Sequence, residues 1–324
     1  MSLYAFAAVL VSIIALKFLA PILIYLILSL FFTILLAPIF RFFDRKGLPA
    51  ILAYFLTLFG FVVIVGAVIV ILESSSKEFS ANLPLYQTKL KELMIQMQAY
   101  LNRYHVDPGV LSEIDVLGIL KKFIANFGSV LKGFLIVVIG VSFLLFESKD
   151  FGKKIAAFSK NPHYFEAFFA SVQKYFLIKT FTSFLTGLFV GLMLYAFGVP
   201  YAFLFGFLAF VLNYIPVIGS IIAAVPGIAL ALVTYGIETA LWVALLYLVI
   251  NISISNVLEP KIMGDGLDLS AAVVFFSLVF WGWIFGVVGT FFAVPLTMTL
   301  KLALQSSPKT RHWAMLLSRY KESG

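Results

Sequence analysis

The sequence contains no cysteine. Disulfide bonds, thiolate nucleophiles and metal sites with cysteine ligands are therefore excluded. Common catalytic motifs are also missing, because the chain has no nucleophile elbow, no paired-histidine zinc helix and no phosphate-binding Gly-Lys-Ser/Thr loop. We therefore expect no enzymatic activity, no cofactor, no metal site and no ATP-driven step carried out by this chain alone.

Charge is scarce as well. Only 12% of the 324 residues are charged and 62% are hydrophobic, whereas soluble domains carry about 25% charged residues. Long runs contain no Asp, Glu, Lys or Arg: 18–40, 48–72, 180–237, 239–258 and 269–300. A helix needs about 20 apolar residues to cross a bilayer. The composition predicts an all-α polytopic membrane protein with about 6–8 transmembrane helices.

The few charges that exist are unevenly placed. The formal charge is +8, and segments 41–47, 147–179 and 301–324 hold 14 of the 23 Lys and Arg residues. Basic residues that flank membrane spans favour the cytoplasmic side, so the pattern indicates topology rather than binding of nucleic acid. We expect the C-terminus in the cytoplasm, and the N-terminus there too if residues 3–16 and 18–40 both span.

The N-terminal part, residues 1–72, is predicted to form transmembrane helices. Its first apolar run is too short for a full crossing, so it is short, tilted or joined to the next run through Lys17 and Pro21. Residues 128–179 are predicted to form one transmembrane helix and a basic cytoplasmic segment. Residues 304–324 are predicted to form a basic cytoplasmic tail.

Residues 73–127 differ in kind from the rest. Charges are spread through them, and apolar residues recur at helical spacing on both sides of a turn at Asp107–Gly109. We interpret them as an extracytoplasmic amphipathic helical segment. Its apolar stripes either pack on each other and on neighbouring subunits, or recognise a partner.

The C-terminal half contains an internal repeat. Residues Gly219–Pro226 (GSIIAAVP) recur 70 residues later as Gly289–Pro295 (GTFFAVP). The repeat predicts two units in a transport core, 180–234 and 239–303, each with one intact span and one broken or re-entrant helical hairpin. The two units would then form an inverted repeat. An alternative interpretation makes 201–234 and 270–300 single long spans.

Proline and glycine mark the predicted breaks. Proline removes a backbone donor, and unpaired backbone at membrane depth is tolerated only where protein or a water-filled cavity covers it. A broken membrane helix is therefore a candidate site. The expected hairpin and break positions are Pro216, Gly219, Pro226, Pro260, Gly264, Gly286, Gly289 and Pro295.

Polar side chains within the core are few and clustered. Uncharged amides suit a small polar solute, and Glu259 is the carboxylate closest to a break, where it could bind Na⁺ or H⁺. The alternative role of these groups is hydrogen bonding between helices. The candidate solute or ion pathway is made of Asn213, Tyr214, Asn251, Ser255, Asn256, Glu259 and Lys179.

Five motifs together resemble the autoinducer-2 exporter family of bacterial membrane proteins: Gly198–Pro200, Asn213–Ser220, Asn256–Gly264, Trp281–Trp283 and Val294–Pro295. The residues of these motifs resemble the autoinducer-exporter branch of the family more than the branch described as sodium(lithium)/proton antiporters. The resemblance covers the whole layout, although its specific motifs lie between about residues 179 and 301.

The resemblance implies an exporter in the bacterial inner membrane that acts in quorum sensing, forms homopentamers and moves its solute by an elevator-like shift in each subunit. Val217 departs from the pattern, where the exporter branch has a polar Asn. Three functions are consistent with these observations: a secondary transporter exporting a small polar solute such as autoinducer-2, a Na⁺(Li⁺)/H⁺ antiporter, and an oligomeric scaffold or channel.

Overall fold

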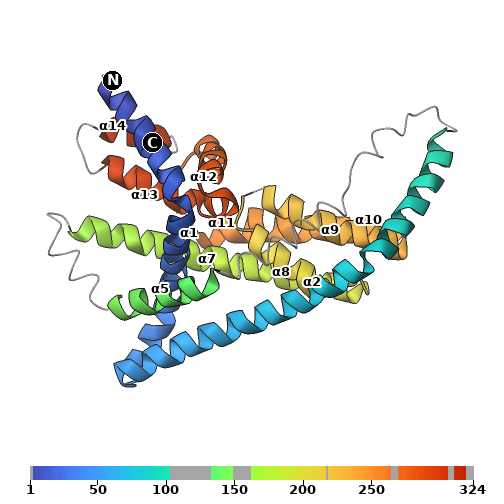
Figure 1. The fold of residues 1–324 in the computed structure, drawn as a ribbon, viewed down its shortest axis with the longest axis horizontal. Coiled ribbons are helices and arrows are strands. Elements are labelled where there is room, and N and C mark those ends of the chain that lie inside the picture. Colours follow the sequence, from blue (N-terminus) through green and yellow to red (C-terminus); the bar gives the residue numbers. More distant parts are fainter. Residues whose placement is uncertain are drawn as a thin grey trace. The chain divides into compact units, whose positions relative to one another are not determined.

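The computed structural model describes residues 3–102, 133–148, 162–216, 218–263, 269–305 and 310–318. All secondary structure in these ranges is helical, and six of the described helices are long and apolar enough to cross a membrane (Figure 1). The prediction of a polytopic all-α membrane protein is confirmed. The chain divides into two compact units, each of which is described by itself.

Unit 1 contains residues 1–62, 134–178 and 263–324. Its helices are α1 (Leu3–Arg45), the start of α2 (Ala50–Asn102), α5 (Phe134–Glu147), the start of α7 (Pro162–Ala196), α12 (Ala271–Phe291), α13 (Ala293–Gln305) and α14 (Arg311–Leu317). The buried Phe31 ring of α1 packs edge-on against Phe176, Phe291 and Phe292. Aromatic packing of this kind joins α1, α7 and the C-terminal helices.

Helix α1 is continuous from Leu3 to Arg45, with Pro21 inside it. At about 1.5 Å per residue its 43 residues extend for about 65 Å. Of the three options for the first apolar run, the structure has the one in which it joins the next. The N-terminus was expected in the cytoplasm only if residues 3–16 and 18–40 were two separate spans. Because they form one helix, which does not reverse direction, that condition is not met.

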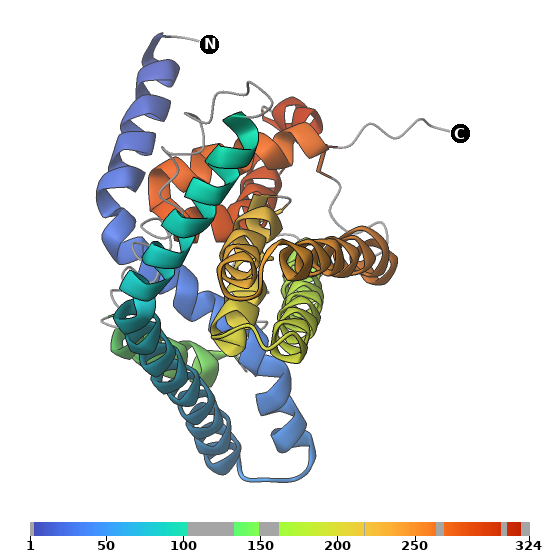
Figure 2. The same ribbon diagram turned by 90° about the vertical axis from the view of Figure 1, so that its right-hand side faces the viewer.

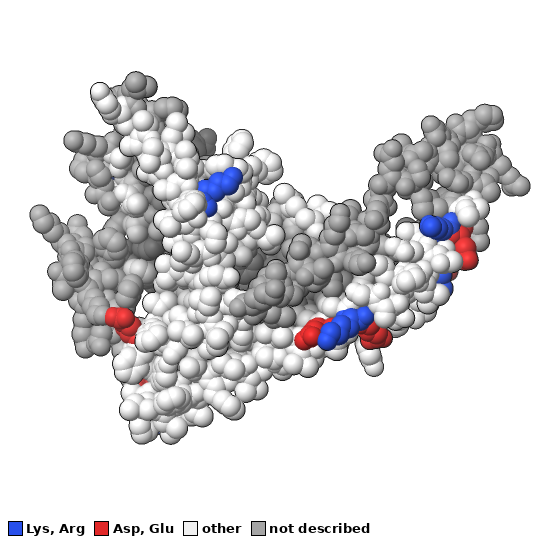
Figure 3. Space-filling model, in the orientation of Figure 1, with Lys and Arg blue, Asp and Glu red and all other residues white. Residues whose placement is uncertain are grey.

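Helix α2 is also longer than a membrane span. It runs without interruption through residue 73, so the change in composition there is no break in the helix. On the face seen in Figure 3, charged side chains lie mainly over the C-terminal half of this helix. The turn at Asp107–Gly109 and the second amphipathic stripe lie outside the described residues.

Unit 2 contains residues 63–133 and 179–262. Besides the rest of α2 and α7 it holds α8 (Ala202–Leu212), α9 (Ile218–Tyr235), α10 (Ile237–Asn251), the π-helix η1 (Ile252–Leu258) and most of α11 (Glu259–Met263). Helices α7, α8 and α9 lie side by side in Figures 1 and 2. A Cβ on Gly187 would lie 2.7 Å from the Gly206 carbonyl oxygen, so Gly187, which stands at a GxxxG spacing with Gly191, lets α8 approach α7 closely.

Both predicted hairpins are broken helices with the same tight turn. In unit 2, α8 ends and α9 begins around Pro216, and a Cβ on Gly219 would lie 1.8 Å from the Leu212 carbonyl oxygen. In unit 1, α12 is kinked at Gly286, where φ is 65°, and a Cβ on Gly289 would lie 1.9 Å from the Trp281 carbonyl oxygen. Neither segment is one straight helix, and the choice between re-entrant hairpins and membrane-crossing spans stays a prediction.

Three prolines expected at breaks lie inside helices instead. Pro226 is buried within α9, whereas Pro260 and Pro295 stand in the first turn of α11 and α13. Pro295, in the first turn of α13, loses no helical hydrogen bond, whereas Pro260 lies within the continuous helix Ile237–Met263, directly after the π-helical turn η1. Gly264 and Val217 lie outside the described residues.

A strained residue opens the first hairpin. Tyr201, which precedes α8, has φ 60° and ψ 31°, a left-handed conformation that is rare for an aromatic residue. Its hydroxyl accepts a hydrogen bond of 2.9 Å from Asn82 Nδ2 on α2, and its ring packs edge-on against Phe79 and Tyr86. These contacts within unit 2 hold Tyr201 in a backbone conformation that costs about 1–2 kcal/mol.

Candidate functional site

A polar stripe runs along the part of α7 that lies in unit 2. Lys179, Thr182, Ser183 and Thr186 occur at i, i+3, i+4 and i+7, so they share one face of the helix. None of them is more than 4% exposed. Buried polar groups need hydrogen-bond partners, and these partners come from the break after α8, from α11 and, for Thr186, from α7 itself.

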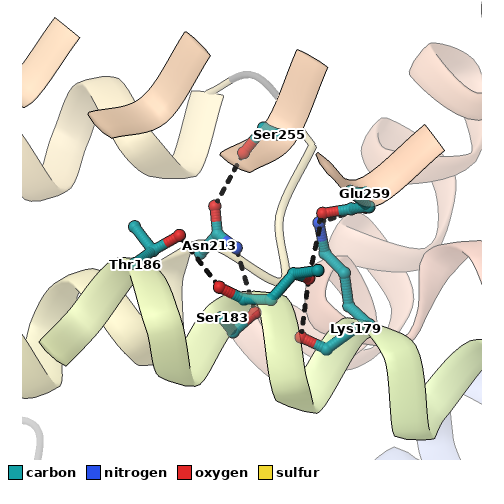
Figure 4. Close-up of polar contacts among 7 residues, drawn as sticks. Lys179, Ser183, Thr186, Asn213, Ser255 and Glu259 are labelled. Carbon is teal, nitrogen blue, oxygen red and sulfur yellow. Dashed lines mark hydrogen bonds and ion pairs between the residues drawn. The ribbon is translucent and has the colours of Figure 1, made fainter. Parts of the chain in front are cut away.

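Asn213 lies at the centre of this arrangement (Figure 4). It follows the last residue of α8, and its side-chain amide is 3% exposed. Asn213 Nδ2 donates to Ser183 Oγ at 3.0 Å, and Ser255 Oγ of η1 donates to Asn213 Oδ1 at 3.3 Å. One amide thereby bridges α7 and η1 across the break of the first hairpin.

The second part of the site is an ion pair. Lys179 Nζ lies 2.8 Å from Glu259 Oε1 and 2.9 Å from Oε2, and the two side chains are only 5% and 15% exposed. Thr182 Oγ1 lies 3.1 Å from Glu259 Oε2 and 3.2 Å from the Lys179 carbonyl oxygen, so its single proton serves two acceptors. The Glu259 carboxylate, expected as a possible cation ligand, already has a lysine as its counter-ion.

Tyr214, the next residue of the break, also contacts α7. Its ring is 2% exposed and its hydroxyl donates to Thr180 Oγ1 at 2.5 Å. The ring also packs edge-on against Phe210 of α8. Tyr214 therefore fixes the hairpin turn to α7, and Asn213 beside it is held in place.

The remaining amides of the predicted pathway are placed differently. Asn251 Nδ2 donates to the Tyr247 carbonyl oxygen one turn back, while Asn251 Oδ1 is buried without a hydrogen-bond partner among the described residues. Asn256 is exposed. The sequence pattern assumed one α-helical face for Asn251, Ser255 and Asn256, but residues 252–258 form a π-helix, in which the directions of the side chains change.

Sequence reasoning missed Thr182, Ser183 and Thr186. Their signal was present, since hydroxyl residues at helical spacing continue from Lys179 into an apolar run. It also missed η1, where Glu259 N–H donates to the Ile254 carbonyl oxygen five residues back. Such π-helical turns occur frequently at functional sites.

The chemistry of this site is polar and neutral. The charges of Lys179 and Glu259 cancel, and the other groups are hydroxyls and an amide that can both donate and accept hydrogen bonds. The described residues contain no group of three or more His, Asp or Glu side chains that could hold a metal ion. Such a site suits a small solute with several hydroxyl or carbonyl groups.

The second hairpin carries a smaller polar cluster within unit 1. Trp281 Nε1 donates to Thr297 Oγ1 at 2.9 Å, and Thr297 Oγ1 donates to Ser277 Oγ at 2.7 Å. Ser277 and Thr297 are buried. The broken hairpins of both units therefore have hydroxyl groups packed against them.

Comparison with known proteins identifies relatives along nearly the whole chain. The family model described as AI-2E family transporter matches residues 6–309. A "Putative transport protein" of Haemophilus influenzae is 35% identical over 333 residues, covering 98% of this chain and 95% of its own. The "AI-2 transport protein TqsA" of Escherichia coli is 34% identical over 312 residues, covering 93% of this chain and 91% of its own.

Proposed function

Because the chain belongs to the AI-2E family of transporters, we propose that it is a secondary transporter that exports a small polar solute, with autoinducer-2 as the first candidate. The observation that carries this proposal is the neutral cluster of buried Asn213 and Ser183 with partly buried Ser255 at the break of the first hairpin. Solute hydroxyls can replace its internal hydrogen bonds one for one, so binding leaves no buried polar group unpaired.

The proposed mechanism is alternating access. Broken helices that meet at a binding site are the common design of secondary transporters, in which the site is exposed to one side of the membrane at a time. We place the protein in the bacterial inner membrane, with the basic tail 304–324 in the cytoplasm and the hairpins forming an inverted repeat. A homopentamer with one pathway in each subunit and an elevator-like shift follow from the family resemblance.

The cation/proton antiporter is the competing function. In an antiporter the cation would bind at the Glu259 carboxylate. Lys179 Nζ lies 2.8 Å from that carboxylate and would repel a cation. The pair therefore favours an uncharged solute over Na⁺ at this position.

Efflux of labelled autoinducer-2 tests the proposal directly. Cells that produce the protein should retain less of the label than cells with an empty vector, and proteoliposomes should release preloaded label faster than protein-free vesicles. Equal retention in both strains, together with Na⁺-dependent proton movement in the proteoliposomes, would overturn it in favour of the antiporter.

A further inference from the structure

The Lys179–Glu259 ion pair lies where the chain enters and leaves the second segment of unit 2. The chain passes from unit 1 to unit 2 between Ile178 and Lys179, and it returns between Ile262 and Met263. Lys179 is thus the first residue of the segment 179–262, and Glu259 lies three residues before its end. The ion pair therefore joins the beginning of this segment to its end, within unit 2.

The continuous helix formed by α10, η1 and α11, which carries Glu259, is held at two points, by α9 near Tyr247 and by α7 near Glu259. Toward its start, Tyr247 OH donates to the Ala223 carbonyl oxygen of α9 at 3.0 Å, and both the ring and the bond are buried. Toward its end, Glu259 bonds Lys179 and Thr182 of α7. The π-helix η1 lies between these two fixed points.

The π-helical register is what allows both contacts at once. Glu259 N–H donates to the Ile254 carbonyl oxygen, whereas in an α-helix its acceptor would be the Ser255 carbonyl oxygen. A change of register by one residue rotates the two ends of the helix relative to each other by about 100°. With Tyr247 held on α9, this rotation would carry the Glu259 carboxylate away from Lys179.

We propose that η1 and the Lys179–Glu259 pair form a two-state clasp, closed in the π register and open in the α register, whose opening uncovers the polar stripe of α7. Opening removes the ion pair and gives the Glu259 N–H the α-helical acceptor Ser255, whereas Pro260, which has no N–H, donates in neither register. The two states therefore exchange the ion pair for α-helical hydrogen bonds of the residues before Pro260. Such a balanced element is what a conformational switch requires. The clasp deepens the proposed transport function by naming the contact that would gate the site.

The absence of native cysteine gives a direct readout of the clasp. A Ser183→Cys variant places one thiol at a position that is fully buried in the closed state. Its rate of reaction with a membrane-permeant maleimide, measured on the full-length protein in proteoliposomes, reports how often the stripe is uncovered. This readout requires no transported solute, so it is independent of whether autoinducer-2 is the cargo.

Removing both charges should open the clasp. In the Ser183→Cys background, Lys179→Met with Glu259→Gln should raise the labelling rate at least about tenfold, because the closed state then loses the attraction between Lys179 and Glu259 at 2.8 Å and no unpaired charge is left buried. Thr182→Val keeps both charges and removes one hydrogen bond to Glu259, so it should raise the rate about threefold. Lys261→Gln, which removes an exposed charge from the same short helix, is the matched control and should leave the rate unchanged.

Deleting Val257, an exposed residue of η1, tests the register itself. The deletion removes the extra residue that the π turn accommodates, so η1 becomes α-helical while Tyr247 and Glu259 keep their relative direction, and the register can no longer switch. Labelling should therefore stay at or below the parental rate, and adding the charge-free pair to the deletion should raise it less than the same pair does in the parent. Labelling rates within twofold of the parent for both the charge-free variant and Thr182→Val, in protein that elutes as a monodisperse peak, would overturn the clasp. Failure of autoinducer-2 efflux with the labelling pattern intact would overturn the cargo alone.

Discussion

Asn213 is the residue on which the candidate site is built. It meets α7 through Ser183 and η1 through Ser255, and it uses both ends of its amide to do so. Aspartate at this position would lose the donor, leucine would lose both donor and acceptor, and glutamine would carry the amide one methylene further from the backbone. The side chain therefore determines both the packing of the break and the chemistry offered to a solute.

Replacing Asn213 by leucine tests this role. The change keeps the volume but leaves the Ser183 and Ser255 hydroxyls without their partner, which costs about 1–3 kcal/mol. The initial rate of solute efflux from proteoliposomes should fall at least about tenfold at equal protein content. Asn256→Leu is the matched control, because the same amide is removed from an exposed position of η1, and its efflux rate should equal that of the parent. Equal loss in both variants would contradict the assignment.

At the scale of elements, the two hairpins share one device. In each, a glycine carries no side chain because the carbonyl oxygen of a residue seven or eight positions earlier occupies that space. The repeated sequence motif begins at these glycines, Gly219 and Gly289. The similarity of the two halves is therefore explained by a backbone contact that any Cβ would prevent.

Gly219→Ala should destabilise the protein. The added Cβ would lie 1.8 Å from the Leu212 carbonyl oxygen, so the hairpin has to open, at a cost of about 2 kcal/mol or more. The midpoint of thermal unfolding in detergent should fall by about 5 °C or more. Gly66→Ala in α2 has no atom within 4 Å of its new Cβ and should unfold at the parental temperature or slightly above it. An unchanged midpoint for Gly219→Ala would contradict the tight turn.

How much of these elements could be predicted depends on the range of the forces that form them. Charge-free runs and the Asn213–Pro216 break are local features, and both were read correctly from the sequence. The continuity of α1 through Pro21 was only one of three options, because a proline in a membrane helix is tolerated when neighbouring groups satisfy the freed carbonyl. The π-helix was missed, and so was the pairing of Lys179 with Glu259, which lie 80 residues apart in the sequence. Long-range pairs of this kind leave no periodic signal.

At the scale of the whole molecule, orientation in the membrane follows from the basic segments and the repeat. If the two hairpins are inverted, the loop between α11 and α12 faces the cytoplasm, together with the tail 304–324. The inverted arrangement remains a prediction from the repeat and from the positive-inside rule.

An Asp265→Cys variant of the cysteine-free chain tests the orientation. An impermeant maleimide added to intact spheroplasts should leave this thiol unmodified, whereas inverted membrane vesicles should be labelled. A cysteine introduced at Ser323 in the C-terminal tail should give the same pattern and serves as the reference for the cytoplasmic side. Labelling of Asp265→Cys from outside in intact spheroplasts would refute the inverted repeat.

The length of α2 has a mechanical consequence for any such transporter. The chain passes from unit 1 to unit 2 between Val62 and Val63, near the start of a continuous helix of 53 residues. A continuous helix can only curve gently. If the transport cycle displaces one unit against the other, α2 has to bend, and the energy stored in the bent helix favours the return movement. The same amount of energy has to be supplied when the helix is first bent.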